Sequence, residues 1–84
     1  MRPYAVYINE GALGFAPRSG PQRKMVMDFI RSLAVNPNTT GDFSETDETG
    51  RTTRVKVVGR YAVTFWADHA VSEIKVTHIR LADE

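Results

Sequence analysis

The sequence contains no cysteine, which excludes disulfide bonds and thiol nucleophiles from its stability and its chemistry. It also has no apolar run near the ~18 residues of a membrane-spanning helix, and its first residues lack the apolar core of a signal peptide. We therefore expect a cytoplasmic protein that makes no contact with a membrane. Histidine is scarce, with only His69 and His78, and neither stands in a ligand motif, so we expect no metal site and no cofactor.

A large excess of one charge is also missing, since the net charge is +1, but the charges are segregated along the chain. Residues 51–80 carry six lysines or arginines and two acidic residues, whereas residues 42–48 carry four acidic residues and no basic one. This pattern predicts a folded surface with one basic and one acidic region. The length of 84 residues and the content of 42% hydrophobic residues are typical of one small globular domain.

The second half of the chain alternates between apolar and polar residues in three stretches, which is typical of strands. These predicted strands cover residues 52–58, 60–67 and 72–79, with turns at residues 59 and 68–70. Residues 3–9 predict a first strand, and residues 41–47 are either a further strand or a loop. Because the connections are short, we expect the strands of the second half to form an antiparallel meander.

One main helix is predicted to begin near Pro21 and to end before Pro37, because the residue before a proline avoids the helical conformation. Its apolar residues recur at helical spacing on one face: Val26, Phe29, Ile30 and Leu33. Residues 10–16 allow at most one or two helical turns, because they contain two glycines. The predicted fold class is therefore α+β, a two-layer sandwich in which an antiparallel meander sheet of four to five strands packs against one main helix.

The polar side of the predicted sheet is the candidate functional surface. By simple alternation, this side is expected to hold Arg54, Lys56, Arg60, Ala62, Thr64 and Trp66, joined from the last strand by Glu73, Lys75, Thr77 and Ile79. Cations on such a surface can neutralise phosphates, and an aromatic side chain can stack on a base. The predicted RNA-binding residues are Arg54, Lys56, Trp66 and Lys75. The alternative is a solvated sheet face whose tryptophan is covered by a chain segment or a partner.

His78 has two interpretations. It shares strand parity with Ile74 and Val76, which predicts a hydrogen-bonded residue at the edge of the core. A histidine can also transfer protons near neutral pH, so a catalytic role is the alternative. His69 is expected to be a turn residue.

The order strand, helix, meander, ending in RVKVVGRYAVTFWAD and then EIKVTHIR, resembles the RelE/ParE superfamily of bacterial toxins from toxin–antitoxin systems. The resemblance covers nearly the whole chain and rests on this pattern more than on an invariant motif. It implies a single RelE/ParE-like domain over residues 1–84 and an antitoxin protein as its partner. Ribosome-dependent members of the family cleave messenger RNA without a metal, and the 2′-hydroxyl of the RNA is the nucleophile. The resemblance therefore implies an mRNA endoribonuclease, with the ribosome and messenger RNA as further partners.

The resemblance also implies roles for individual residues. Arg54 and Lys56 match the family's pair of basic residues on the strand before the turn. The arginine that active members carry just after the tyrosine of the turn falls at Ala62, and Arg60 is the nearby substitute. These basic residues would bind phosphate and stabilise the transition state.

Two further positions complete the implied catalytic set. Arg80 corresponds to the arginine near the end of the last strand. Many active members use a C-terminal tyrosine or histidine as acid or base, and because this sequence ends LADE, His78 would stand in for it. The catalytic residues implied by the resemblance are Arg54, Lys56, Arg60, His78 and Arg80.

Two other classes of function stay open. The absent arginine and the absent terminal acid or base favour a non-catalytic relative, either a gyrase-directed toxin or a protein-interaction module. The third class is a protein that forms a homodimer through its sheet, with Trp66, Ile79 and residues 41–48 in the interface.

Overall fold

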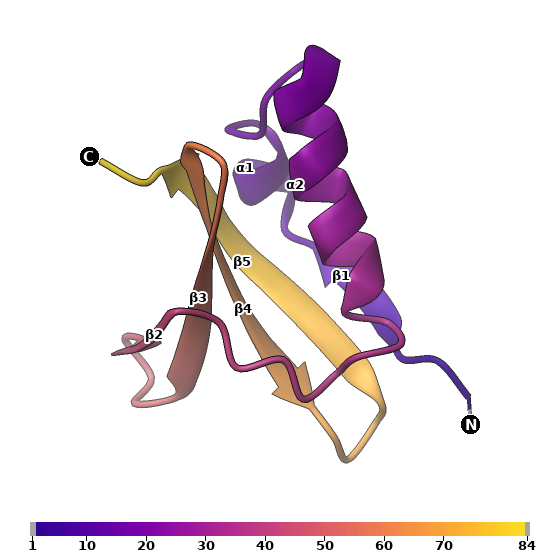
Figure 1. Ribbon diagram of the computed structural model, residues 1–84. Helices are drawn as coiled ribbons and strands as arrows, with labels where there is room; N and C mark the ends of the chain where they lie inside the picture. Colours follow the sequence, from indigo (N-terminus) through magenta and orange to yellow (C-terminus); the bar gives the residue numbers. More distant parts are fainter. Residues whose placement is uncertain (1, 84) are drawn as a thin grey trace.

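The computed structural model describes residues 2–83. In this part of the chain the elements follow the order β1 (Ala5–Ile8), α1 (Glu10–Leu13), α2 (Gly20–Ser32), β2 (Phe43–Thr46), β3 (Thr52–Val58), β4 (Tyr61–Asp68) and β5 (Glu73–Leu81). The strands form one sheet in the order β1-β5-β4-β3-β2, and both helices lie on the same side of it (Figure 1). The predicted α+β two-layer sandwich is confirmed.

The four strands β2 to β5 form the predicted antiparallel meander. β1 adds to the edge of β5 in parallel, with Val6 opposite Ile74 and Ile8 opposite Val76. A parallel pair cannot be joined by a tight turn, and here the whole of residues 9–72 lies between the two strands. The sheet is therefore mixed, with its one parallel pair in residues 2–83 at the β1 edge.

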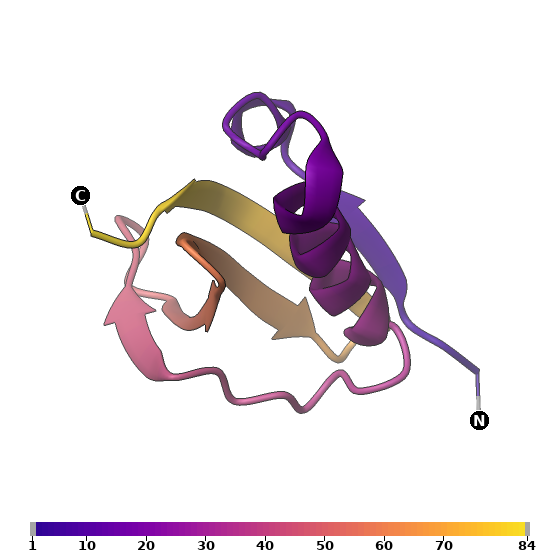
Figure 2. The same ribbon diagram turned by 45° about the horizontal axis from the view of Figure 1, so that its top comes forward.

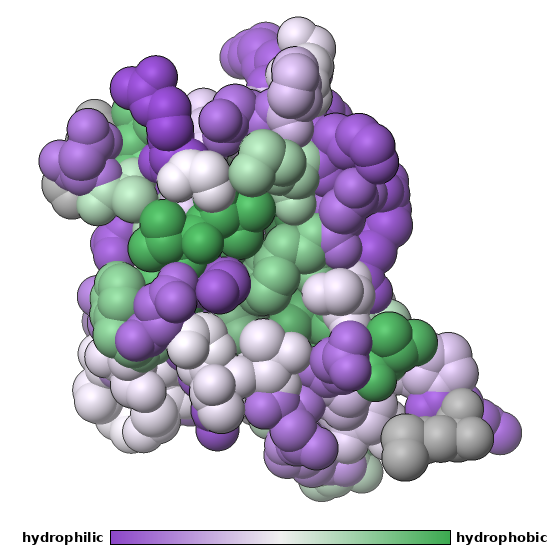
Figure 3. Space-filling model, in the orientation of Figure 1, coloured by the Kyte–Doolittle hydropathy of each residue, from purple (hydrophilic) through white to green (hydrophobic). Residues whose placement is uncertain are grey.

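α2 forms because a proline lies where a helix can begin and because its apolar residues recur at helical spacing. Ser19 is its N-cap residue and Pro21 lies in its first turn, where the missing N–H has no partner to lose. Val26, Ile30 and Leu33 are buried against the sheet, and the ring of Phe29 meets the ring of Phe65 edge to face. The outward side of α2 is hydrophilic, and hydrophobic side chains gather beside it at the centre of the same face (Figure 3).

The side of the sheet away from the helices is concave, because the sheet curls until β2 approaches the end of β5 (Figure 2). We call this side the concave face. It has its own small buried group, separate from the core under α2: Thr53, Val55, Ala62 and Thr64. Curling lets β2 and its turn shield these side chains even though no helix of the described residues covers them.

The turn between β3 and β4 divides the predicted basic face. Only Gly59 and Arg60 form the turn, so Val58 pairs directly with Tyr61. Residues directly opposite each other in an antiparallel pair share a face. Even-numbered residues of β3 therefore lie on the same side as odd-numbered residues of β4, and simple alternation across the turn gives the wrong side.

Arg54 lies opposite Phe65 and Lys56 lies opposite Val63, so both basic residues are on the helix side of the sheet. The expectation that they share a face with the even-numbered residues of β4 is wrong. Those residues, which do lie together on the concave face, are Ala62, Thr64 and Trp66.

A β-bulge changes the alternation along β5. Val76 lies opposite Phe65 and His78 lies opposite Thr64, which leaves Thr77 as the extra residue without a partner on β4. The residues after the bulge are shifted by one position relative to those before it. The alternation of β5 therefore cannot be counted straight through from Glu73 to Leu81.

The bulge corrects two expectations. His78 lies on the concave face and is exposed, so the expectation that it sits with Ile74 and Val76 at the edge of the core is wrong. Ile79, which alternation placed on the polar side, is 2% exposed and belongs to the core under the helices. Arg80 follows His78 onto the concave face.

Candidate active site on the concave face

A cavity of about 230 Å³ lies on the concave face, where β2 and its turn curl toward β5. Its lining includes a carboxylate from β2, Glu45, together with an imidazole and a guanidinium from β5, His78 and Arg80. Glu45 Oε2 lies 3.7 Å from Arg80 Nη2. The two strands are not neighbours in the sheet, so only the curl of the sheet brings these groups together.

The ion pair between Glu45 and Arg80 is open to solvent, with side chains 43% and 45% exposed. An exposed pair of this kind contributes only about 0–1 kcal/mol to stability. Both charged groups can therefore exchange partners at little cost. The guanidinium is free to take a phosphate, because its planar array of donors matches phosphate oxygens better than a single carboxylate oxygen at this distance.

His78 is oriented by the bulge residue beside it. Its Nδ1 lies 3.0 Å from the Thr77 hydroxyl oxygen. When the hydroxyl donates to Nδ1, the proton of a neutral imidazole resides on Nε2, which is the nitrogen left for a ligand. The bulge thus places His78 on the concave face, and its residue Thr77 provides a hydrogen-bond partner for one of the two ring nitrogens.

The rim of the cavity is acidic on the β2 side. Asp47 accepts hydrogen bonds from the Thr49 hydroxyl at 2.6 Å and from the backbone N–H groups of Thr49 and Arg51, each at 2.9 Å. The Thr49 hydroxyl is the main reason that the pKa of Asp47 lies below its ordinary value, followed by these N–H groups and the Arg51 charge. Glu48 also lines the cavity. The acidic segment predicted from the sequence therefore lies close to the strand that carries His78 and Arg80.

Of the five predicted catalytic residues, two line this cavity and three lie elsewhere. Lys56 Nζ lies 3.4 Å from Asp42 Oδ1 on the helix side of the sheet, next to the exposed Arg54. Arg60 is in the turn between β3 and β4, where its backbone N–H donates to Gln22 Oε1 at 3.5 Å. His78 and Arg80 are the two in the cavity.

The predicted RNA-binding residues are divided in the same way. Trp66 and Lys75 are neighbours on the concave face, with Lys75 Nζ 5.3 Å from the centre of the indole ring. Arg54 and Lys56 lie on the other side of the sheet. Arg51, which alternation did not select, lies closer to the indole than Lys75 does, with its Cζ 3.9 Å from the ring centre.

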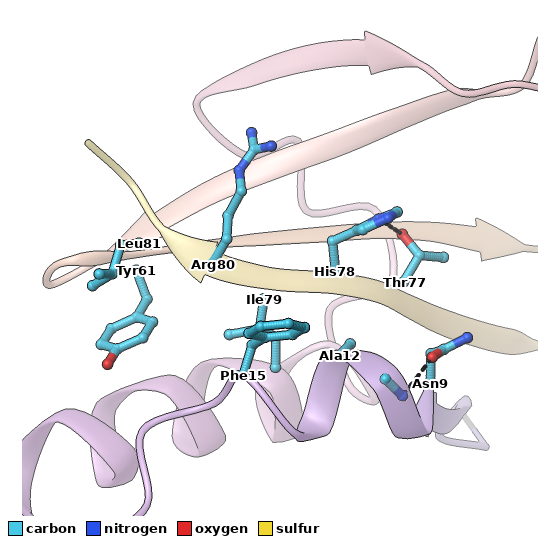
Figure 4. A pocket seen from close by; sticks show the side chains of 10 residues that line it. Asn9, Ala12, Phe15, Tyr61, Thr77, His78, Ile79, Arg80 and Leu81 are labelled. Atoms are coloured by element: carbon cyan, nitrogen blue, oxygen red, sulfur yellow. Dashed lines mark hydrogen bonds between the residues drawn. The ribbon is translucent and has the colours of Figure 1, made fainter. Parts of the chain in front are cut away.

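A second, larger cavity of about 620 Å³ lies on the helix side, between α1 and the end of β5 (Figure 4). We call it the apolar groove. Its apolar lining consists of Ala12, Phe15, Tyr61, Ile79 and Leu81. Phe15 is 74% exposed although its ring points at Ile79. In the same view the side chains of His78 and Arg80 leave β5 on the side away from α1.

Sequence reasoning did not select Glu45 as a site residue, and it placed Thr77 on the candidate surface without foreseeing the bulge there. The signal for Glu45 was the cluster of acidic residues at 42–48. The sequence predicts that this segment pairs with the next strand, β3, but pairing with β3 does not indicate that Glu45 also reaches β5. Thr77 has no signal in the sequence, because a bulge is recognised only from the register of two strands. Within residues 2–83, no three His, Asp or Glu side chains are grouped to hold a metal ion, and neither helix is long and apolar enough to cross a membrane.

No protein-family model and no curated protein matches the sequence of this chain. The fold matches a chain in the crystal structure of the toxin–antitoxin complex RelBE2 from Mycobacterium tuberculosis, with a TM-score of 0.72 and 18% sequence identity. The match covers 94% of this chain and 98% of that chain. This chain therefore has a RelE-like toxin fold, which confirms the fold implied by the sequence resemblance.

Proposed function

We propose that this chain, which has a RelE-like toxin fold, is itself a toxin that cleaves messenger RNA. The observation that carries the proposal is the meeting of Glu45, His78 and Arg80 at one cavity of the concave face. A carboxylate can act as a base, an imidazolium as an acid and a guanidinium as a stabiliser of the phosphate charge, and these are the roles that a phosphodiester transfer needs when no metal ion takes part.

The proposed reaction uses the 2′-hydroxyl of the RNA as the nucleophile. Glu45 takes the proton from this hydroxyl while the 2′-oxygen forms a bond to the adjacent phosphorus. The bond between phosphorus and the 5′-oxygen of the next nucleotide breaks, and His78 in its protonated form gives a proton to that oxygen. The products are a 2′,3′-cyclic phosphate and a free 5′-hydroxyl, so the proton gained by Glu45 balances the proton lost by His78.

Arg80 is proposed to hold the non-bridging oxygens of the reacting phosphate. Negative charge on these oxygens grows toward the transition state, and a fixed guanidinium stabilises it more than the ground state. In the free protein Arg80 faces Glu45 at 3.7 Å. Binding of a phosphate to Arg80 would release Glu45 from this pair and leave it free to act as a base.

The acidic rim supports a role for the ribosome. Glu45, Asp47 and Glu48 all line the cavity, and their charges oppose the entry of a phosphate of free RNA into the cavity itself. A messenger that is already held in place by the ribosome does not have to be attracted by the protein's own charge. We propose that the toxin acts on such a bound messenger and leaves free RNA largely intact.

The experiment is cleavage of messenger RNA by purified protein in the presence of programmed ribosomes. We expect Glu45→Gln, His78→Gln and Arg80→Gln each to lower the cleavage rate by about 10²-fold or more, the range found for removal of one acid, base or oxyanion donor. Arg54→Gln is the matched comparison, because Arg54 lies on the other side of the sheet. Its predicted catalytic role would be supported only by an equally large loss.

Two results would count against the proposal. One is intact messenger with the wild-type protein, and the other is a larger loss from Arg54→Gln than from Arg80→Gln. Intact messenger together with trapped, cleaved DNA would instead favour the gyrase-directed alternative. In cells, induction of the wild-type chain alone should arrest growth, and Arg80→Gln should relieve the arrest at equal levels of soluble protein.

A specific observation also favours an antitoxin partner. Phe15 is largely exposed at the apolar groove, where it continues the apolar lining, and a contiguous apolar surface of this kind is typical of a site of protein contact. We propose that an antitoxin encoded beside this chain covers the groove. Phe15→Ser should weaken copurification of the two proteins, whereas Met25→Ser, which changes an exposed apolar residue of α2, should not. Equal copurification by both variants would remove the groove from the interface.

A further inference from the structure

Four side chains form a row across the concave face in which aromatic and cationic residues alternate. The register places Tyr7 of β1 opposite Lys75 of β5, and Lys75 opposite Trp66 of β4. Arg51, just before β3, completes the row, because its Cζ lies 3.9 Å from the centre of the Trp66 ring. We call these residues the aromatic–cation row: Tyr7, Lys75, Trp66 and Arg51.

The row is accessible. Tyr7 is 52% exposed, and the side chains of Arg51 and Lys75 are 44% and 35% exposed. A large aromatic residue on the outer side of a sheet is normally packed against another element. The groups that the structure places over Trp66 are the two cations, whose long side chains have several rotatable bonds and can be rearranged by a ligand.

The two cations are only weakly engaged by acidic residues. Arg51 Nη1 lies 3.5 Å from Asp47 Oδ2, and Lys75 Nζ lies 3.3 Å from Glu73 Oε1. Both pairs are partly exposed, and ion pairs in contact with solvent contribute only about 0–1 kcal/mol to stability. Asp47 is also satisfied by the donors of its own turn. A phosphate can therefore replace either carboxylate without leaving a buried charge unpaired.

The row continues into the cavity that holds Glu45, His78 and Arg80. Trp66 is two residues from Thr64 on the same face of β4, about 7 Å along the strand, and Thr64 lines the cavity. Asp47 belongs to both places, since it lines the cavity and faces Arg51. A strand of RNA whose scissile phosphate lies at Arg80 therefore meets the row with its neighbouring nucleotides.

We propose that the aromatic–cation row binds the nucleotides of single-stranded RNA that flank the cleavage site. One base stacks on Tyr7 and another on the Trp66–Arg51 pair, and phosphates contact Lys75 and Arg51. The two aromatic residues are two strands apart, about 10 Å at the usual strand spacing, which leaves room for the backbone between their bases. Aromatic rings and guanidinium planes both stack on bases, and such contacts tolerate any sequence. This inference rests on the proposed function for the identity of the ligand.

Trp66 is the single tryptophan of the sequence, so protein fluorescence reports directly on the row. The probe is a short single-stranded oligoribonucleotide whose 2′-oxygens are methylated, because it can bind but lacks the nucleophile for cleavage. We expect it to change the Trp66 emission, with an affinity that falls as salt is added. For single strands, the slope of log affinity against log salt is about −0.7 for each phosphate neutralised.

Arg51→Gln should weaken binding of the probe and make this slope shallower by about 0.7, because one phosphate contact is lost. Tyr7→Ala should weaken binding by about 5- to 150-fold, the loss typical of one stacked base, with no change of slope. Lys24→Gln is the matched charge control, since Lys24 is an exposed cation on α2. It should leave the slope unchanged, and the unfolding midpoints of all variants should show that they are folded.

The results separate this inference from the proposed function. Probe binding with an unchanged slope in Arg51→Gln, or no binding by the wild type, would overturn the role of the row. If the protein binds the probe through the row but leaves ribosome-bound messenger intact, the cleavage proposal is wrong and the role of the row stands. If Arg51→Gln shifts the oligomeric state in size-exclusion chromatography while probe affinity stays the same, the row is a protein interface and the inference is wrong.

Discussion

Gly41 offers a test of how the loop after α2 is attached to the sheet. It adopts a left-handed conformation with φ of +75°, and a Cβ atom added there would lie 2.7 Å from the carbonyl oxygen of Val55. The next residue holds the loop against β3, because the Asp42 N–H donates to the Val55 carbonyl and Asp42 Oδ2 accepts from the Val57 N–H, each at 2.8 Å. Gly41→Ala should therefore push the loop away from β3.

The expected loss has two parts. The left-handed conformation costs an L-residue about 1–2 kcal/mol. Displacing the loop also weakens the two hydrogen bonds of Asp42, each with a net value of about 0.5–1.5 kcal/mol. The sum is a loss of about 2–5 kcal/mol, which is a large part of the roughly 4–13 kcal/mol expected for the free energy of unfolding of a domain this size.

Gly50 is the matched control. It has φ of +84°, but a Cβ atom added there meets no atom within 4 Å. Gly50→Ala therefore isolates the backbone cost of about 1–2 kcal/mol. The free energies of unfolding would come from urea titrations followed by Trp66 fluorescence. Equal losses in the two variants would refute the account of the Gly41 contact with Val55.

Three further predictions concern stability. Phe65 is 1% exposed and Phe15 is 74% exposed. Phe65→Ala should therefore lower the free energy of unfolding by about 3–5 kcal/mol, and Phe15→Ala should lower it by about 0.5 kcal/mol or less. Similar losses for the two variants in urea titrations would contradict this prediction. The Thr49 hydroxyl holds the pKa of Asp47 below its ordinary value of 3.8, so the stability from this carboxylate is complete above about pH 4 and is lost as the pH falls through the lowered value. Asp47→Asn should therefore lose less stability than the wild type between neutral pH and acid, and an identical pH profile would argue against the role of Asp47. Deletion of Thr77 should leave a regular ladder with His78 still on the concave face, because the bulge residue has no partner on β4; a melting curve by circular dichroism that shows a large destabilisation would count against this register.

Local patterns in the sequence were enough to predict the main helix, the strands of the meander and their packing in two layers. The apolar spacing in residues 26–33 predicts α2, and a helix can bury such a stripe only against another element. Alternation predicts β3, β4 and β5 to within two residues of their observed ends. The order of these elements also carries the resemblance to RelE/ParE toxins, whose fold is confirmed.

The candidate site needed the tertiary structure. Alternation has a period of two, so one residue more or less in a turn or a bulge moves every later side chain to the other face. The two-residue turn at Gly59 and Arg60 separates Arg54 from Trp66 in this way, and the bulge at Thr77 brings His78 onto the concave face.

What the sequence by itself determined is a main helix, a meander and a mixture of basic and acidic segments, because these depend on residues close together in the chain. What only the tertiary structure decided is which charged groups meet. Glu45 and Arg80 are 35 positions apart and lie on strands that do not pair. They approach because the sheet twists and curls, and that curvature is a property of all its strands together.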